Sequence, residues 1–385
     1  MNIKTTYLYL AVTVFLNMSA IAVENFPGEA PTINRQVRNL GMGNVGVAIE
    51  GSHDSSPFYN PAGLNDLEKG RFQFLSPTFV LSKNAVDLIG DIKDLKDDLD
   101  SAASDPDKTR VFNEFVQNNS GKFRYIRFSM DVFNYVRKNF AAGLVIDERL
   151  SLSVRQAGSN PQFNLRNLGD AAFYVSGAHD FWEKLLQVGV TIRPTVRFAI
   201  NEQDEIVDYS DIGDDANGDL KLTGQLENIK ERRFGMGVDL GLKSNLAFSL
   251  WKDAKWYQLL KPAVGFTWQD IGSPDFGLAP SNGQTMNLGV AVHPDLWKLK
   301  NVVALDLREI NEERPFLTKV HFGLESKLPW IVAVRAGVSQ GYLTAGATFD
   351  LWVLKLDAAI YHEEVGVTSR TDGNLRWAAK ISFNI

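Results

Sequence analysis

A regular alternation of polar and apolar residues restricts the fold of this chain more than any other feature. In residues 374–385, apolar side chains share one face: Leu375, Trp377, Ala379, Ile381, Phe383 and Ile385. The opposite face carries Arg376, Lys380, Ser382 and Asn384. The same two-residue period recurs around 303–308, 319–325 and 354–360. A period of two indicates β-strands that separate two different environments.

The strand pattern predicts fourteen strands, and single-chain bacterial outer-membrane barrels have an even number of strands. The expected ranges are 70–82, 122–133, 139–153, 169–180, 186–200, 231–245, 258–270, 284–293, 300–310, 316–327, 330–339, 341–350, 352–364 and 374–384. Connections after even-numbered strands are compact, whereas 83–121 and 201–230, after odd-numbered strands, are long. Short turns are typical of the periplasmic end and long loops of the extracellular end.

Tryptophan positions distinguish a membrane barrel from a soluble β-sandwich, which also alternates. Six tryptophans fall in or beside the expected periplasmic turns: Trp182, Trp251, Trp256, Trp297, Trp330 and Trp352. Tryptophan is enriched at bilayer interfaces, and a soluble sandwich has no physical reason to place it in alternate turns. The predicted fold class is therefore all-β, a single antiparallel transmembrane β-barrel of about 14 strands over residues 65–385, in the bacterial outer membrane.

The N-terminal region predicts an export signal. Residues 1–22 contain Lys4, an apolar run over 7–16 and a small-residue cleavage site, Ala20-Ile21-Ala22. This pattern is typical of a secretory signal peptide, which would leave a mature chain from about Val23. No later segment has the roughly 18 uninterrupted apolar residues of a membrane helix.

A glycine-rich stretch follows and does not resemble a strand or an ordinary helix. Residues 40–64 contain Gly41, Gly43, Gly46 and Gly51 and end in Phe58-Tyr59-Asn60-Pro61-Ala62-Gly63-Leu64. Dense glycine raises the entropic cost of regular structure, so the stretch needs a surrounding wall. We therefore predict that residues 23–64 form a hatch inside the barrel lumen. Its key residues are Gly41, Gly43, Gly46, Asn60, Pro61, Ala62 and Gly63, with the Asn60 amide bonding the wall backbone and Pro61 fixing φ.

The same glycines also spell the dinucleotide fingerprint G-x-G-x-x-G, from Gly41 to Gly46. That interpretation requires an apolar strand before the motif and a helix after it. Polar residues 34–39 precede it, and Pro57 and Pro61 follow too soon for a helix of ordinary length. The context disfavours a nucleotide site.

Residues 41–48 together with 58–64 resemble the hatch of the FadL-like outer-membrane family, which includes PorV-like barrels. Segments 319–325, 335–337, 341–346 and 361–366 resemble the late strands of that family. The resemblance implies passive uptake of a hydrophobic, fatty-acid-like compound, with outer-membrane lipid as a further partner and no cofactor. The PorV-like branch implies an alternative, a binding and assembly barrel that serves secreted or surface proteins.

Segment 83–121 predicts two short helices over the extracellular mouth. Leu88, Ile92, Leu95 and Leu99 are spaced as one face of a helix, and Phe112 and Phe115 form a second apolar cluster. These six side chains either bind a hydrophobic ligand or pack the loop onto itself and the rim. Both needs are met by the same residue types, so the sequence leaves the two alternatives open.

Pro194 lies inside the expected fifth strand and cannot donate to its ladder. A kink or bulge is expected there, unless Pro194 already stands above the membrane. FadL-like transporters have a kinked strand that opens the wall laterally. The family's kink lies in an earlier strand than Pro194. The resemblance therefore gives only partial support for the same role at Pro194.

The chemistry-bearing residues indicate no enzyme and no metal site. The five histidines are scattered, and His321 is expected to be a solvated lumen residue beside Lys319 and Glu325. The acidic loop 201–230 does not fit a calcium-binding template, because Gly213 and Gly224 occupy the first and last ligand positions. A net charge of −6 argues against nucleic acid as a partner.

Overall fold

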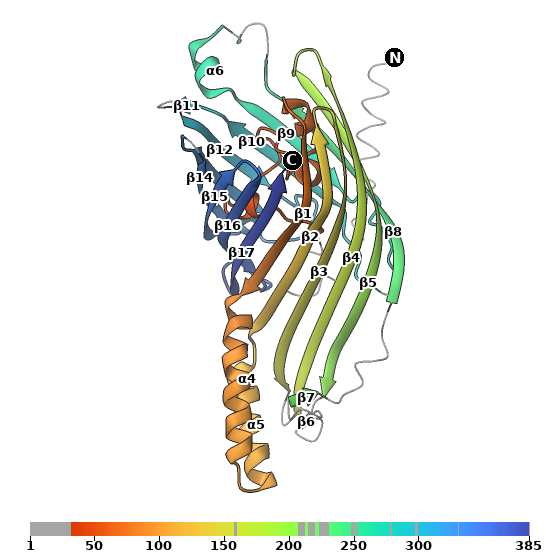
Figure 1. The fold of residues 1–385 in the computed structure, drawn as a ribbon, viewed down its shortest axis with the longest axis vertical. Coiled ribbons are helices and arrows are strands. Elements are labelled where there is room, and N and C mark those ends of the chain that lie inside the picture. The colour runs from red at the N-terminus through yellow and green to blue at the C-terminus, as the bar shows by residue number, and fades with distance from the viewer. Residues whose placement is uncertain are drawn as a thin grey trace.

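The computed structural model describes residues 32–385, except 158–159, 207–211, 215–219, 223–230, 248–250, 252, 278, 297–298, 330 and 385 (Figure 1). The expected signal peptide, 1–22, and the first part of the expected hatch, 23–31, lie outside the described residues, as does most of the acidic loop 201–230.

Within these residues, fourteen strands form one closed antiparallel ring in chain order. They are β1 (Arg71–Ser82), β2 (Phe123–Arg137), β3 (Phe140–Ala157), β4 (Asn160–Phe181), β5 (Leu186–Ile206), β8 (Glu231–Ser244), β9 (Ala263–Gln269), β10 (Thr285–Val292), β12 (Leu299–Leu307), β13 (Val320–Lys327), β14 (Val332–Ser339), β15 (Tyr342–Leu351), β16 (Leu354–Glu364) and β17 (Gly373–Asn384). Pairing of β1 with β17 closes the ring. The predicted fold class and strand number are confirmed.

Three further strands lie outside the ring. The two-residue strand β11 (Asp295–Leu296) extends the ladder of β12 at the rim. The strands β6 (Ile212–Asp214) and β7 (Leu220–Leu222) pair only with each other. Several expected boundaries differ from the structure: β3 and β5 run on to Ala157 and Ile206, and the expected strand 316–327 begins with the short helix α7 (Phe316–Lys319). β4 begins at Asn160 instead of 169, because β3 continues to pair with it beyond the expected end, and residues 255–260 are helical instead of the start of β9.

The polarity of the two faces of the barrel wall is the reverse of that in a soluble protein, with polar side chains inside and apolar side chains outside. In β17, Arg376, Lys380 and Ser382 are buried in the lumen, whereas Trp377 and Phe383 are exposed on the outside. Outward apolar and inward polar side chains are the arrangement of a barrel whose outer surface contacts lipid. The structure is thus that of an outer-membrane β-barrel.

Helices mark the two ends of the barrel (Figure 1). α4 (Lys83–Ser101) and α5 (Asp105–Asn119) form a hairpin that extends beyond the ends of β1 and β2. The Ser82 and Ser104 hydroxyls cap them by accepting from the backbone N–H groups of Ala85 and Asp107. At the opposite end, α6 (Lys255–Leu260) lies between β8 and β9. Among the described residues, no helix is long and apolar enough to span a membrane.

Four of the six tryptophans assigned to periplasmic turns are described, and all four are exposed in connections at the α6 end: Trp182, Trp251, Trp256 and Trp352. The turns that carry them follow β4, β8 and β15. The other two, Trp297 and Trp330, lie outside the described residues.

Single cysteines test this orientation directly, because the chain has no cysteine of its own. Asp97→Cys, exposed on α4, should react with an impermeant maleimide on whole cells. Asp253→Cys, exposed in the turn between β8 and β9, should react only after the outer membrane is opened. The reverse labelling pattern would contradict the assigned orientation.

Candidate functional site

The hatch lies inside the lumen and is built from short pieces that glycine and asparagine allow. α2 (Val37–Leu40) is followed by Gly43 and Asn44, which have φ values of 64° and 62°. Such left-handed backbone favours these two residue types. The Asn39 side chain closes this loop by donating to the Val45 carbonyl at 2.7 Å. α3 (Ser56–Tyr59) and the 3₁₀ turn η1 (Pro61–Asp66) form the other end.

Buried ion pairs fasten the hatch to the wall. Arg38 donates two hydrogen bonds to Glu325 of β13, at 2.9 and 2.7 Å. Arg335 of β14 donates to the same carboxylate at 2.6 Å. On the other side, Asp54 accepts from Lys355 of β16 at 2.5 Å. Removing one partner of a buried pair leaves an uncompensated charge, which typically costs about 3–5 kcal/mol.

Wall side chains also hold the hatch backbone. Asp306 of β12 accepts from the backbone N–H groups of Gly46 and Val47, at 2.7 and 3.0 Å. His321 of β13 donates through Nδ1 to the Gly43 carbonyl at 2.9 Å. The expectation that His321 is solvated is wrong, because the hatch covers it and leaves 3% of it exposed.

A girdle of wall glycines lets the hatch approach the wall at backbone distance. A Cβ atom on any of seven wall glycines would lie within 3.0 Å of a hatch atom: Gly189, Gly241, Gly265, Gly289, Gly323, Gly337 and Gly346. Three directly opposed pairs occur in neighbouring strands, including Gly265 with Gly289. Sequence reasoning missed this girdle. Its signal was a lone glycine at an inward position inside an apolar strand, which marks close approach of another backbone.

The predicted hatch residues lie at this interface or inside the hatch itself. The Asn60 amide donates to the Val47 carbonyl at 2.6 Å and to the wall carbonyl of Leu242 at 3.1 Å. Its oxygen accepts from Ala62 N–H at 3.0 Å, which caps η1. The remaining predicted positions are packed against β strands or against other hatch residues: Gly41, Gly43, Gly46, Pro61 and Gly63.

The predicted ligand-binding residues of the α4–α5 hairpin differ in burial: some are packed and others are exposed. Leu95, Leu99 and Phe112 are buried, and Phe112 stacks on Phe115 with 6.5 Å between ring centroids. Leu88 is half-buried, and Ile92 is exposed. Ile92 instead belongs to an exposed apolar stripe with Val86 and Ile89, of which Ile89 is 72% exposed. The sequence pattern did not single out Val86 and Ile89.

Pro194 interrupts the β4–β5 ladder without shifting it. The pairs Ala172–Thr195 and Val175–Ile192 have the same register, although the two pairs between them are missing. Pro194 is paired in register with Met236 on the other side. The structure therefore shows a gap of two pairs at Pro194 and not an inserted residue. A register shift does occur in β1, between Phe74 and Thr78, where Leu75 has a φ of 46°.

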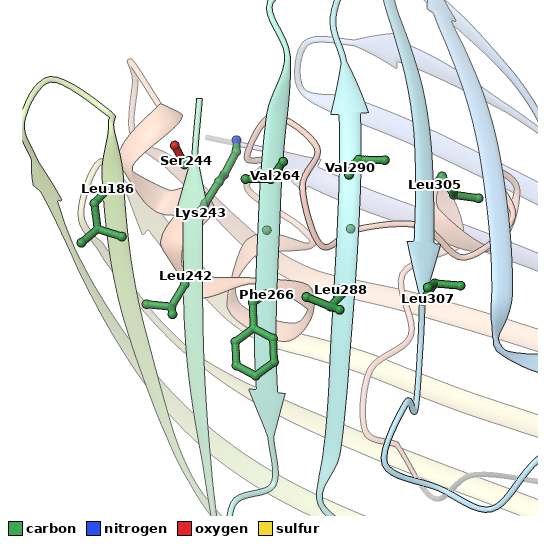
Figure 2. A pocket seen from close by; sticks show the side chains of 12 residues that line it. Leu186, Leu242, Lys243, Ser244, Val264, Phe266, Leu288, Val290, Leu305 and Leu307 are labelled. Carbon is green, nitrogen blue, oxygen red and sulfur yellow. The ribbon is translucent and has the colours of Figure 1, made fainter. Parts of the chain in front are cut away.

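An apolar cavity of about 520 Å³ lies on the outer wall over part of the glycine girdle. Leu242, Phe266 and Leu288 are direct neighbours on β8, β9 and β10 and form one side of it (Figure 2). Val264, Val290 and Leu305 form the other side. Gly265 and Gly289, between the two rows, contact the hatch from the lumen side at Val47. The wall is therefore only one backbone thick between this cavity and the hatch.

No family model and no curated protein matches the sequence. Among solved structures, the chain is similar to the toluene transporter TbuX of Ralstonia pickettii, with 13% identity, 94% of this chain and 99% of that chain covered, and a TM-score of 0.48. It is also similar to the monoaromatic hydrocarbon channel CymD (12%, 94% and 98%, 0.48) and to the P. putida toluene transporter TodX (10%, 94% and 99%, 0.45). At identities of 10–13%, these matches show similarity of fold and do not assign a substrate to this chain.

The glycine girdle predicts a sharp difference between two Gly→Ala substitutions. Gly265→Ala places a methyl group against the hatch backbone at Val47, so the hatch must shift. Gly177→Ala, in β4, is the control, because a Cβ there meets nothing within 4 Å. We expect Gly265→Ala to sensitise cells to bulky hydrophilic antibiotics, while Gly177→Ala behaves as the parent and both barrels stay heat-modifiable on gels. Equal antibiotic sensitivity of the two variants would contradict the position of the hatch against Gly265.

Proposed function

We propose that this barrel carries hydrophobic small compounds passively across the outer membrane, with fatty-acid-like compounds among them. The observation that carries the proposal is the apolar cavity on the wall directly outside the hatch. Its volume of about 520 Å³ falls within the range of small-molecule sites, roughly 300–1,000 Å³. Leucine, valine and phenylalanine form most of its lining, with Lys243 and Ser244 at one end, so it suits a largely apolar ligand.

The filled lumen argues against a general pore for polar solutes. In the extracellular half, Arg197 pairs with Asp170 and lies over the ring of Phe276 at 4.3 Å. Phe276 belongs to the β9–β10 connection, which folds inward and packs against Gly235 of β8. Below this level the hatch occupies the lumen. Porins keep a water-filled interior instead.

The hatch is suited to shifting against part of the wall. At Gly265 of β9 and Gly289 of β10 the hatch meets the wall at backbone distance, through Val47. Its ion pairs with the wall are made to other strands, at Lys243 of β8, Glu325 of β13 and Lys355 of β16. A ligand that loosens the glycine side could move the hatch while the ion pairs hold it in the barrel.

The α4 stripe supports capture at the cell surface. Val86, Ile89 and Ile92 follow each other at intervals of three residues and remain exposed next to the rim. An exposed apolar row of this kind attracts hydrophobic ligands. The same stripe also favours the alternative function, in which the barrel binds an exported protein at the surface.

Selective uptake tests the proposed function. Cells that lack other routes for hydrophobic uptake should accumulate a labelled fatty acid or toluene when this barrel is expressed, with no gain for a sugar of similar mass. Comparison of the fatty acid with toluene identifies the substrate class. Equal gain for the sugar would indicate a porin. No gain for any compound, with an exported protein retained on the purified barrel, would establish the alternative.

Charged substitutions in the exposed stripe test capture separately from folding. Ile89→Asp with Ile92→Asp removes the apolar stripe without touching the packed residues Leu95 and Leu99. We expect hydrophobic uptake to fall severalfold, while Asp94→Asn on the same helix has no effect. Unchanged uptake in the double variant, with the barrel still folded, would limit the hairpin to a packing role.

A further inference from the structure

A second cavity, of about 360 Å³, opens at the periplasmic mouth and is rich in lysine. Its lysines come from five separate parts of the chain: Lys184 before β5, Lys243 of β8, Lys261 after α6, Lys300 of β12 and Lys327 of β13. Among the described residues, three carboxylates share the cavity: Glu50, Asp66 and Asp295. An excess of positive charge in a confined space attracts anions.

Two of the carboxylates are already engaged. Asp66 accepts a hydrogen bond from Lys243 and lies 3.5 Å from the ammonium of Lys184. Asp295 accepts from Lys261 at the exposed rim. These pairs neutralise part of the cavity and tie η1, β8 and α6 together.

Lys300 and Lys327 differ from the three lysines that are paired with these carboxylates. They are directly opposite each other in the β12–β13 ladder. In the part of the chain that the structure describes, no carboxylate oxygen lies within 4.0 Å of either ammonium. Like charges directly opposite on neighbouring strands are destabilising. An anion held between the two lysines would remove this repulsion.

His293 organises the cavity without adding charge. Its Nε2 accepts from the Glu50 backbone N–H at 2.9 Å, and its Nδ1 donates to the Lys261 carbonyl at 3.1 Å. A ring with one accepting and one donating nitrogen is neutral. Burial, together with the charge of Lys243, lowers the pKa of His293. The positive charge of the cavity therefore comes from its lysines.

We propose that this basic mouth binds the phosphate of an anionic phospholipid from the periplasmic leaflet. A tetrahedral phosphate offers oxygens to several ammonium groups at once, and lysine is a common phosphate ligand. The cavity also lies at the right height. Trp256 and Leu259 of α6 are exposed on the outside, as expected at a membrane interface, and Lys261 directly follows this helix.

The apolar cavity supplies a place for the acyl chain of such a lipid. Lys243 lines both cavities. Figure 2 shows its side chain extending toward the periplasmic end, while Leu242 and Phe266 lie further along the strands. The Lys243 ammonium lies on the lumen side at Asp66, and the apolar cavity lies on the outer face, so the headgroup of such a lipid bends over the rim of β8 while its acyl chain stays outside. This inference is independent of which compound the barrel carries.

Binding measurements on the full-length barrel test the proposal. Purified protein is titrated with phosphatidylglycerol or phosphatidylcholine in detergent, and retained lipid is measured by native mass spectrometry. Each lysine near an anionic headgroup contributes about 1 kcal/mol, so the combined variant Lys300→Gln with Lys327→Gln should bind phosphatidylglycerol about thirtyfold more weakly. Lys138→Gln is the matched control, because Lys138 is an exposed lysine of the β2–β3 periplasmic turn, outside the cavity.

The lipid-free protein gives a second readout that a structural role would not produce. Removing the opposed charges should leave the thermal unfolding temperature unchanged or raise it, although lipid binding is lost. Equal binding of phosphatidylglycerol by the double variant and the parent would overturn the proposal, as would equal binding of both lipids by the parent. Tight binding of inorganic phosphate at this site without retention of phosphatidylglycerol would assign it to a soluble anion and overturn the lipid source.

Discussion

The width of a fourteen-stranded ring is the constraint on which the rest of this structure depends. Eight strands enclose an interior that inward side chains can fill, whereas larger rings leave space. Here the N-terminal hatch occupies that space, and its fit requires the wall to lose side-chain volume at the contact. The glycine girdle provides this on seven strands. Ring size, hatch and girdle are therefore parts of one packing solution.

Filling the lumen removes water from many charged groups. Ion pairs and hydrogen bonds between these groups compensate for the lost hydration. Glu325 receives both Arg38 from the hatch and Arg335 from the wall, and Lys380 joins Asp131 to Gln36 of the hatch. Buried charges are tolerated when they are paired and hydrogen-bonded. This network specifies where the hatch lies. Between the described hatch residues and β9 or β10 there are no such pairs, and the proposed movement would begin there.

The two cavities lie where these arrangements meet the membrane. The apolar one is separated from the hatch only by the backbone of β9 and β10, and the basic one opens where η1, α6 and the turn before β12 converge. A passive carrier of hydrophobic compounds needs contact with lipid and a closed path for water. A bound lipid phosphate at the mouth would add a fixed link between the barrel and the periplasmic leaflet.

The sequence by itself determined the alternating faces, the number and approximate ends of the strands and the presence of a hatch, because local periodicity and turn chemistry suffice for these. It could not determine which wall atoms the hatch meets, such as His321 with Gly43 across 278 residues. It also could not show that Ile92 is exposed while Leu95 is packed, or that Lys300 faces Lys327. Those facts depend on strand register and ring closure, which bring together residues that no local pattern relates.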